Sequence, residues 1–104
     1  MAVQLLAPSI EVGLVTTDRD AMVGFYEDFL GLAHQADLDF PGGSMKRYAV
    51  GSNVVLKLVS YDEPPAAAAV PGGGRAQAGI RYFTLVVADV RDAARQAAEA
   101  GHSV

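Results

Sequence analysis

The sequence repeats one local pattern about 70 residues apart: an apolar run, then an acidic helix start, then a closing glycine. The two copies consist of residues 9–16, Asp18 and Gly31, and of residues 80–87, Asp89 and Gly101. An aspartate before a helix can accept hydrogen bonds from its first turn, and a glycine can take the left-handed conformation that ends it. Each copy therefore predicts a strand followed by a helix.

The first copy continues into three further strand-like runs. They cover approximately residues 33–39, 44–50 and 53–60, and glycine-containing turns separate them. The pattern over residues 9–61 is thus β-α-β-β-β. In the expected helix, apolar side chains recur every three or four residues, which predicts one face packed on a sheet. They are Met22, Phe25, Tyr26, Phe29 and Leu30.

The second copy is shorter, because only His102, Ser103 and Val104 follow its glycine. We predict a single domain over residues 1–104, with a linker rich in Ala, Pro and Gly at 62–79 and an incomplete βα module at 80–104. Such a sheet would have an unpaired edge. Two explanations are open: the chain is a shortened form, or a partner completes it in a homodimer by strand or module exchange.

Charge and composition restrict the classes of partner. A formal net charge of −4 disfavours nucleic acid, whose phosphates are bound by clustered Lys and Arg. With no cysteine, any metal must be held by His, Glu or Asp. Residues 1–8 lack the features of a secretory signal, and no apolar run is long enough to cross a membrane. We therefore expect a cytoplasmic protein without a membrane or nucleic-acid partner.

The run beginning at Ile10, IEVGLVTTDRDAMVGFYEDFLGL, resembles the opening of the vicinal oxygen chelate superfamily of glyoxalases, bleomycin-resistance proteins and extradiol dioxygenases. The Phe25-Tyr26 pair and Leu30-Gly31-Leu32 carry the match. The resemblance implies an α+β fold made of βαβββ modules, here one complete and one incomplete. In that family, paired modules form a cup that holds a small molecule, often around a divalent metal.

The resemblance also indicates positions for metal ligands. They fall on Glu11 in the first strand, Lys57 in the last strand of the first module and Tyr82 at the start of the second, while the fourth lies beyond residue 104. Glu11 suits a hard cation, but a protonated lysine has no lone pair and repels one. We therefore expect no metal cofactor. The alternative is a divalent metal with Glu11 as a ligand.

Two other roles are open for the same residues. Strand alternation allows Glu11 and Lys57 to form an ion pair with no chemistry attached. Alternatively the pair, together with Tyr82, orients a polar or anionic small ligand. Arg47 and Tyr48 point to opposite faces of their strand, so one of them should face the cup, and Arg47 is included as a candidate ligand-binding residue.

These observations leave two classes of function. The favoured hypothesis is a cup-shaped binding protein of the resistance type, which holds a small molecule and lacks the standard metal centre. The alternative is a metal-dependent lyase, isomerase or dioxygenase of the glyoxalase type. If the protein is an enzyme without metal, Glu11 is the candidate general base. Whether it is an enzyme at all is left open.

Overall fold

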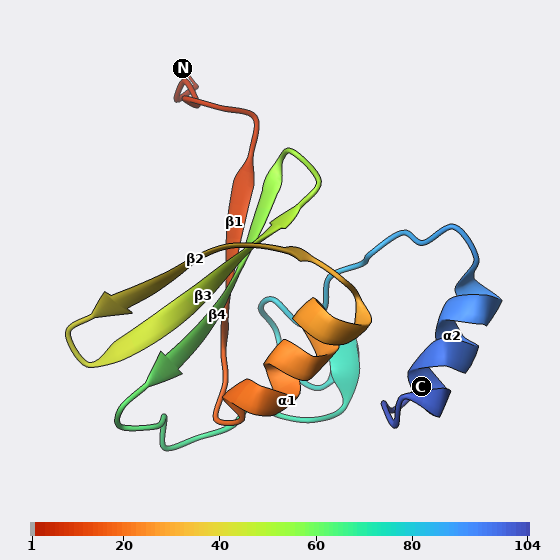
Figure 1. The fold of residues 1–104 in the computed structure, drawn as a ribbon. Helices are drawn as coiled ribbons and strands as arrows, with labels where there is room; N and C mark the ends of the chain where they lie inside the picture. Colours follow the sequence, from red (N-terminus) through yellow and green to blue (C-terminus); the bar gives the residue numbers. More distant parts are fainter. Residues whose placement is uncertain (1) are drawn as a thin grey trace. The chain divides into compact units, whose positions relative to one another are not determined.

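The predicted β-α-β-β-β order is present in the first part of the structure. The computed structural model describes residues 2–104, which divide into two compact units, the first ending at Pro65 and the second comprising Ala66–Val104. The first unit contains four strands and one helical segment (Figure 1). In chain order these elements are β1 (Ile10–Val15), α1 (Arg19–Val23), the π-helix η1 (Gly24–Phe29), β2 (Ala33–Phe40), β3 (Gly43–Val50) and β4 (Val54–Tyr61). The α+β fold class is confirmed.

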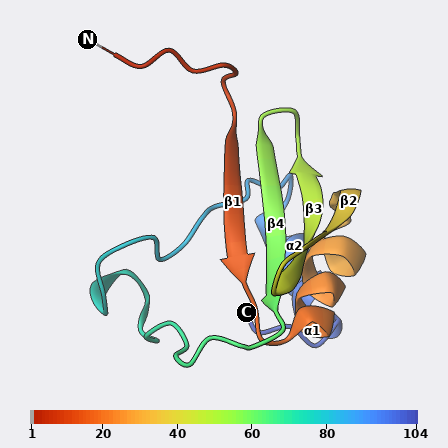
Figure 2. The same cartoon turned by 90° about the vertical axis from the view of Figure 1, so that its left-hand side faces the viewer.

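The four strands form one mixed sheet in the order β1-β4-β3-β2. The helical segment returns the chain to the end of the sheet where β1 began, so β2 runs in the same direction as β1 at the opposite edge. Two hairpins then bring the chain back, and β4 pairs with β1 in parallel. Parallel neighbours need a long connection, which the intervening helix and hairpins supply. Figure 2 shows β4 between β1 and β3.

The first helix begins as the sequence predicts and then changes its hydrogen bonding. Asp18 caps it by accepting a bond from the amide N of Ala21 at 3.1 Å. From Gly24 the segment is a π-helix, in which the amide of Leu30 donates to the carbonyl of Phe25, five residues earlier, at 2.9 Å. Gly31 ends it with a φ of 69°.

This helical segment packs on one face of the sheet and closes a small core. Its buried members are Tyr26, Tyr48, Leu56 and Leu58, surrounded by partly buried apolar side chains of β1 and the helix. Tyr48 is fully buried, and among the described residues its hydroxyl has no hydrogen-bond partner. Burial raises the pKa of Tyr48 above its ordinary value, because the phenolate is the form that loses most from desolvation.

The second unit contains one short 3₁₀ turn, η2 (Gly73–Arg75), and the helix α2 (Val90–Glu99). The predicted helix is therefore present, with Asp89 as its N-cap and Gly101 following it at a φ of 88°. The strand predicted at residues 80–87 is wrong, because the structure assigns no strand there. A β-like run becomes a strand only when a neighbouring strand hydrogen-bonds with its backbone.

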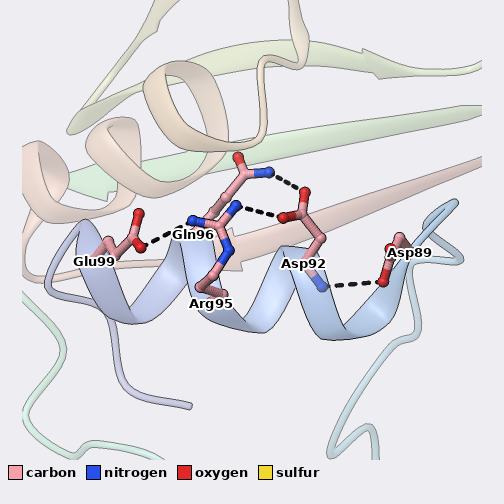
Figure 3. A network of polar contacts seen from close by, with 5 residues as sticks. All are labelled: Asp89, Asp92, Arg95, Gln96 and Glu99. Carbon is pink, nitrogen blue, oxygen red and sulfur yellow. Dashed lines mark hydrogen bonds and ion pairs between the residues drawn. The ribbon is translucent and has the colours of Figure 1, made fainter.

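A polar network runs along one side of α2 (Figure 3). Asp89 accepts a bond from the amide of Asp92 at 3.0 Å, and Gln96 donates to the Asp92 carboxylate at 2.6 Å. Arg95 pairs with Asp92 and, at 2.9 Å, with Glu99. No residue of α2 is buried. Of the helices in residues 2–104, none combines the length and hydrophobicity needed to span a bilayer.

The glycine-rich part of the predicted linker is organised by an arginine that the sequence reading did not single out. Arg81 donates to the carbonyl of Gly73 at 3.0 Å, to the side chain of Gln77 at 3.2 Å and to the carbonyl of Val70. Gly72 and Gly73 have positive φ, which lets the backbone curl around the guanidinium. One side chain thus holds three points of this segment together.

Candidate ligand site on the distal face of the sheet

The sheet has a second face, opposite α1 and η1, which we call the distal face. Because side chains alternate along a strand, residues next to the core residues point to it. Val12 and Leu14 of β1 join the core, so Glu11, Gly13 and Val15, which alternate with them along the strand, lie on the distal side. By the same reasoning Lys57 lies there between Leu56 and Leu58.

Three charged side chains meet on the distal face. The Nη2 atom of Arg47 lies 2.6 Å from Oε1 of Glu11, and the Nζ atom of Lys57 lies 3.4 Å from the same oxygen. The side chains of Arg47 and Lys57 are 25% and 26% exposed, whereas that of Glu11 is 45% exposed. The two cations are thus more buried than the carboxylate that pairs with them.

The two cations alter the ionisation of Glu11. The hydrogen bond from Arg47, and then that from Lys57, hold the pKa of the Glu11 carboxyl below its usual value, against a smaller opposing effect of desolvation. Glu11 is therefore ionised throughout the neutral range. A general base with a lowered pKa is a weak proton acceptor, so this environment does not favour Glu11 in that role.

The strand register arranges the distal face in rows that cross the sheet. One row consists of Gly13, Lys57, Arg47 and Ala36, from β1 to β2. The two charged residues are direct cross-strand neighbours, and residues with little or no side chain flank them. A Cβ atom built on Gly13 would meet nothing within 4 Å, so the space beside Lys57 on β1 is open to a ligand within this unit.

The next row is apolar. It consists of Val15, Val59, Met45 and Leu38. Successive rows are two residues apart along each strand, so this row lies about 7 Å from the charged one. Val15 and Leu38 are 53% and 44% exposed, which leaves apolar surface beside the two cations.

A pair of aromatic rings follows the apolar row. Phe40 and Tyr61 meet edge to face over Gly43, with ring centroids 5.8 Å apart and planes at 76°. A Cβ atom at Gly43 would lie 2.5 Å from the carbonyl oxygen of Ser60 and 2.7 Å from the Cζ atom of Phe40. Glycine at this position avoids both clashes.

The structure brings together three of the four candidate residues. Glu11, Lys57 and Arg47 form one group, and Arg47 is the nearest partner of Glu11, a contact that the sequence reading did not anticipate. The signal was present in the hairpin, since residues 47 and 57 are cross-strand partners in register. Tyr82 is 78% exposed and lies in the second unit, so its part in a shared site stays a prediction.

A separate polar group lies on the other face of the sheet. Asp37 accepts a bond from Lys46 at 2.9 Å and interacts with Nε2 of His34 at 2.8 Å. The bond from Lys46, followed by that from His34, lowers the pKa of Asp37. His34 is therefore engaged with a carboxylate at the β2 edge and is not part of the distal group.

Comparisons with known proteins agree with this topology. The family model of the glyoxalase, bleomycin-resistance protein and dioxygenase superfamily matches residues 9–104. The chain belongs to this superfamily. Its βαβββ module is the first unit, and the superfamily match extends through the second. A comparison with curated proteins found no match.

A crystal structure of a protein designated SMU.1112c resembles the chain in fold. The TM-score is 0.70 at 19% sequence identity, and the alignment covers 93% of this chain and 77% of that one. At this level of identity the likeness concerns the fold alone. It supports the superfamily topology of the chain and says nothing of the ligand.

The group formed by Glu11, Arg47 and Lys57 does not suit the divalent metal found in many members of the superfamily. Lys57 and Arg47 place two positive charges beside the oxygen of Glu11 that a metal would need, and neither side chain offers a lone pair. Among residues 2–104, no three His, Asp or Glu side chains gather in a group that could hold a metal ion. The donor set around Glu11 does not fit a divalent cation.

Proposed function

We propose that the protein binds a small organic molecule on the distal face of its sheet and does so without a resident metal. One observation carries this proposal: a half-buried group of Arg47, Glu11 and Lys57 lies beside an apolar row in which Val15 and Leu38 are exposed. Binding sites combine an apolar lining with a few polar groups that fix orientation, and this face has both.

The sheet supplies one wall of such a site, and we propose that a second copy of the chain supplies the rest. Superfamily members commonly assemble their cups from paired modules, and the outer edge of β1 has no strand partner among the described residues. Unpaired edges favour association with another strand. A resistance-type role in the cytoplasm, in which a harmful compound is sequestered without chemistry, fits this arrangement.

Two measurements on the purified chain of residues 1–104 test the proposal. The first is metal analysis after incubation with Mn²⁺, Fe²⁺, Ni²⁺ and Zn²⁺ in turn, with the Glu11→Gln variant as a control. We expect less than stoichiometric metal in both proteins. Stoichiometric metal that is lost in Glu11→Gln would overturn the metal-free proposal and favour a lyase, isomerase or dioxygenase of the glyoxalase type.

The second measurement maps binding by NMR with two small amphiphiles of different shape, each used as its carboxylate and as its neutral amide: 2-naphthoate with 2-naphthamide, and octanoate with octanamide. We expect at least one of the four to shift amide signals of β3 and β4. If none binds on the distal face, the proposed function is wrong. Sedimentation equilibrium of the same sample tests the second copy, and a monomer would remove that part of the proposal.

A further inference from the structure

We propose that the ligand is a singly charged anion with an apolar body, its charged end on Arg47 and Lys57 and its body along the sheet toward Phe40 and Tyr61. This inference rests on the proposed function and names the class of molecule. It follows from the charges on the distal face and from the order of its rows, each of which can be traced to individual residues.

The charged side chains of the distal face carry an excess of positive charge. On the distal face the strand alternation places two cations, Arg47 and Lys57, and one anion, Glu11. Two positive charges less one negative charge leave a net charge of +1, although the whole chain carries −4. The acidic side chains Asp37 and Asp39 lie on the opposite side of β2, since they alternate with the distal Leu38. The excess positive charge is thus local to this face.

The cations have more hydrogen-bond donors than their contacts with Glu11 use. Both contacts go to the single oxygen Oε1 of Glu11, yet a guanidinium has five N–H donors and an ammonium has three. Both cations are about three-quarters buried, and a buried charge without full compensation is costly. A carboxylate can accept hydrogen bonds from both cations at once, which would supply the missing charge and acceptors.

The order of the rows limits the shape of the ligand. Gly13 and Ala36 at the ends of the charged row are too small to cover the cations, so the row remains accessible along its length within this unit. The apolar row begins about 7 Å away and the aromatic pair about 13 Å away. A molecule with an anionic end and an aromatic or aliphatic body of roughly this length would contact all three rows.

The position of Glu11 predicts how it affects the ligand. Glu11 shares both cations with the incoming anion, so it competes for their hydrogen bonds and repels the same charge. Removing its charge in Glu11→Gln should strengthen binding of an anion. Removing a cation in Lys57→Met or Arg47→Met should weaken it. This opposite response separates an anion-binding role from a merely structural ion pair.

The experiment compares affinities of the carboxylate and amide probes for the same protein by NMR titration. We expect each carboxylate to bind about tenfold or more tightly than its amide, since hydrogen bonds to charged groups are stronger than those between neutral groups. The preference should fall severalfold in Lys57→Met and Arg47→Met, rise in Glu11→Gln, and weaken with added salt because the site is partly exposed.

A matched control uses the other face of the same strand. The side chain of Lys46 is 19% exposed and pairs with Asp37 on the core side of β3. Lys46→Met therefore removes a similar positive charge from the face opposite the proposed site. It should leave the carboxylate preference unchanged. Far-UV circular dichroism and thermal melting check that each variant folds. If a methionine variant does not fold, Lys57→Gln or Arg47→Gln is used in its place.

The outcomes distinguish the two levels of the proposal. If neither carboxylates nor amides bind on the distal face, the proposed function itself fails. If amides bind as tightly as carboxylates, or if Lys46→Met lowers the preference as much as Lys57→Met, small-molecule binding stands and the anionic class is wrong. A preference that depends on Lys57 and Arg47 but not on Lys46 supports the inference.

Discussion

The two helical segments of the chain start and stop by the same local chemistry but are held by different interactions. Asp18 and Asp89 cap their first turns, and Gly31 and Gly101 follow their last turns with positive φ. Yet the first segment buries Tyr26 against a sheet, whereas α2 buries no residue.

The difference teaches that capping signals determine where a helix begins and ends, while its stability depends on what its apolar face contacts. A helix of ten residues is marginal in water without tertiary contacts. In α2 the side-chain pairs among Asp92, Arg95, Gln96 and Glu99 supply local support. The first segment instead draws on the core beneath it, so the two should respond to different substitutions.

The largest expected effect comes from the core of the first unit. Leu58→Ala should lower the free energy of unfolding by about 2–5 kcal/mol, because Leu58 is 1% exposed and its truncation leaves a cavity. Urea denaturation followed by far-UV circular dichroism measures it. Val90→Ala in α2 is the control, since Val90 is 71% exposed and should change little. A loss below about 1 kcal/mol for Leu58→Ala would contradict the described core.

The two capping aspartates offer a direct comparison. Asp18→Ala should lower the free energy of unfolding of the first unit by about 1 kcal/mol, a typical value for an N-cap. Asp89→Ala should reduce the helicity of α2, read from NMR chemical shifts, and leave the main urea transition in place. Equal shifts of that transition in both variants would mean that α2 unfolds together with the sheet.

Another substitution tests the description of the core. Tyr48→Phe should raise the free energy of unfolding by up to about 1 kcal/mol, because it removes a buried hydroxyl with no hydrogen-bond partner among the described residues. Thermal melting measures the change. Tyr61→Phe is the control, because Tyr61 is 44% exposed. A destabilised Tyr48→Phe would indicate that the hydroxyl has a partner, such as a buried water.

The smallest effect is expected on the surface of α2. Arg95→Ala should lower the helicity of α2 by less than Asp89→Ala does, and the difference should shrink in high salt. The hydrogen bond from the side chain of Arg95, and to a smaller extent that from Gln96, lowers the pKa of the Asp92 carboxyl. The contribution of a carboxylate with a lowered pKa is present above its unfolded pKa and disappears as pH falls through the folded value. Helicity that is unchanged between neutral and strongly acidic pH would contradict this network.

Much of the first unit could be predicted from residues close together in the sequence. Turn glycines, alternating strands and the cap at Asp18 act over a few residues, and all of them appear where expected. The π-helix could not be predicted in this way, because the bond from Leu30 to Phe25 replaces the usual i to i−4 bond as the segment packs. The strand predicted at 80–87 failed because pairing depends on a neighbour that local sequence does not specify.

The sequence predicted which residues form the candidate site but not which of them are in contact. Family resemblance and alternation placed Glu11 and Lys57 on one face, and the structure agrees. The closer contact, from Arg47 to Glu11, joins strands that are separated by β4, so it depends on the strand order across the sheet. The rows of the distal face depend on the same order, which periodicity within one strand does not reveal.

The parallel pairing of β1 with β4 also has a consequence for the order of folding. Strands β2, β3 and β4 are joined by short hairpins, whereas Ile10 meets Val54 only after the whole intervening chain has been arranged. Contacts between distant residues carry a higher entropic cost and form more slowly. We therefore expect β1 to dock last. Since β1 contributes Glu11, Arg47 and Lys57 can pair with its carboxylate only after this last strand has docked. Formation of these ion pairs therefore coincides with completion of the sheet.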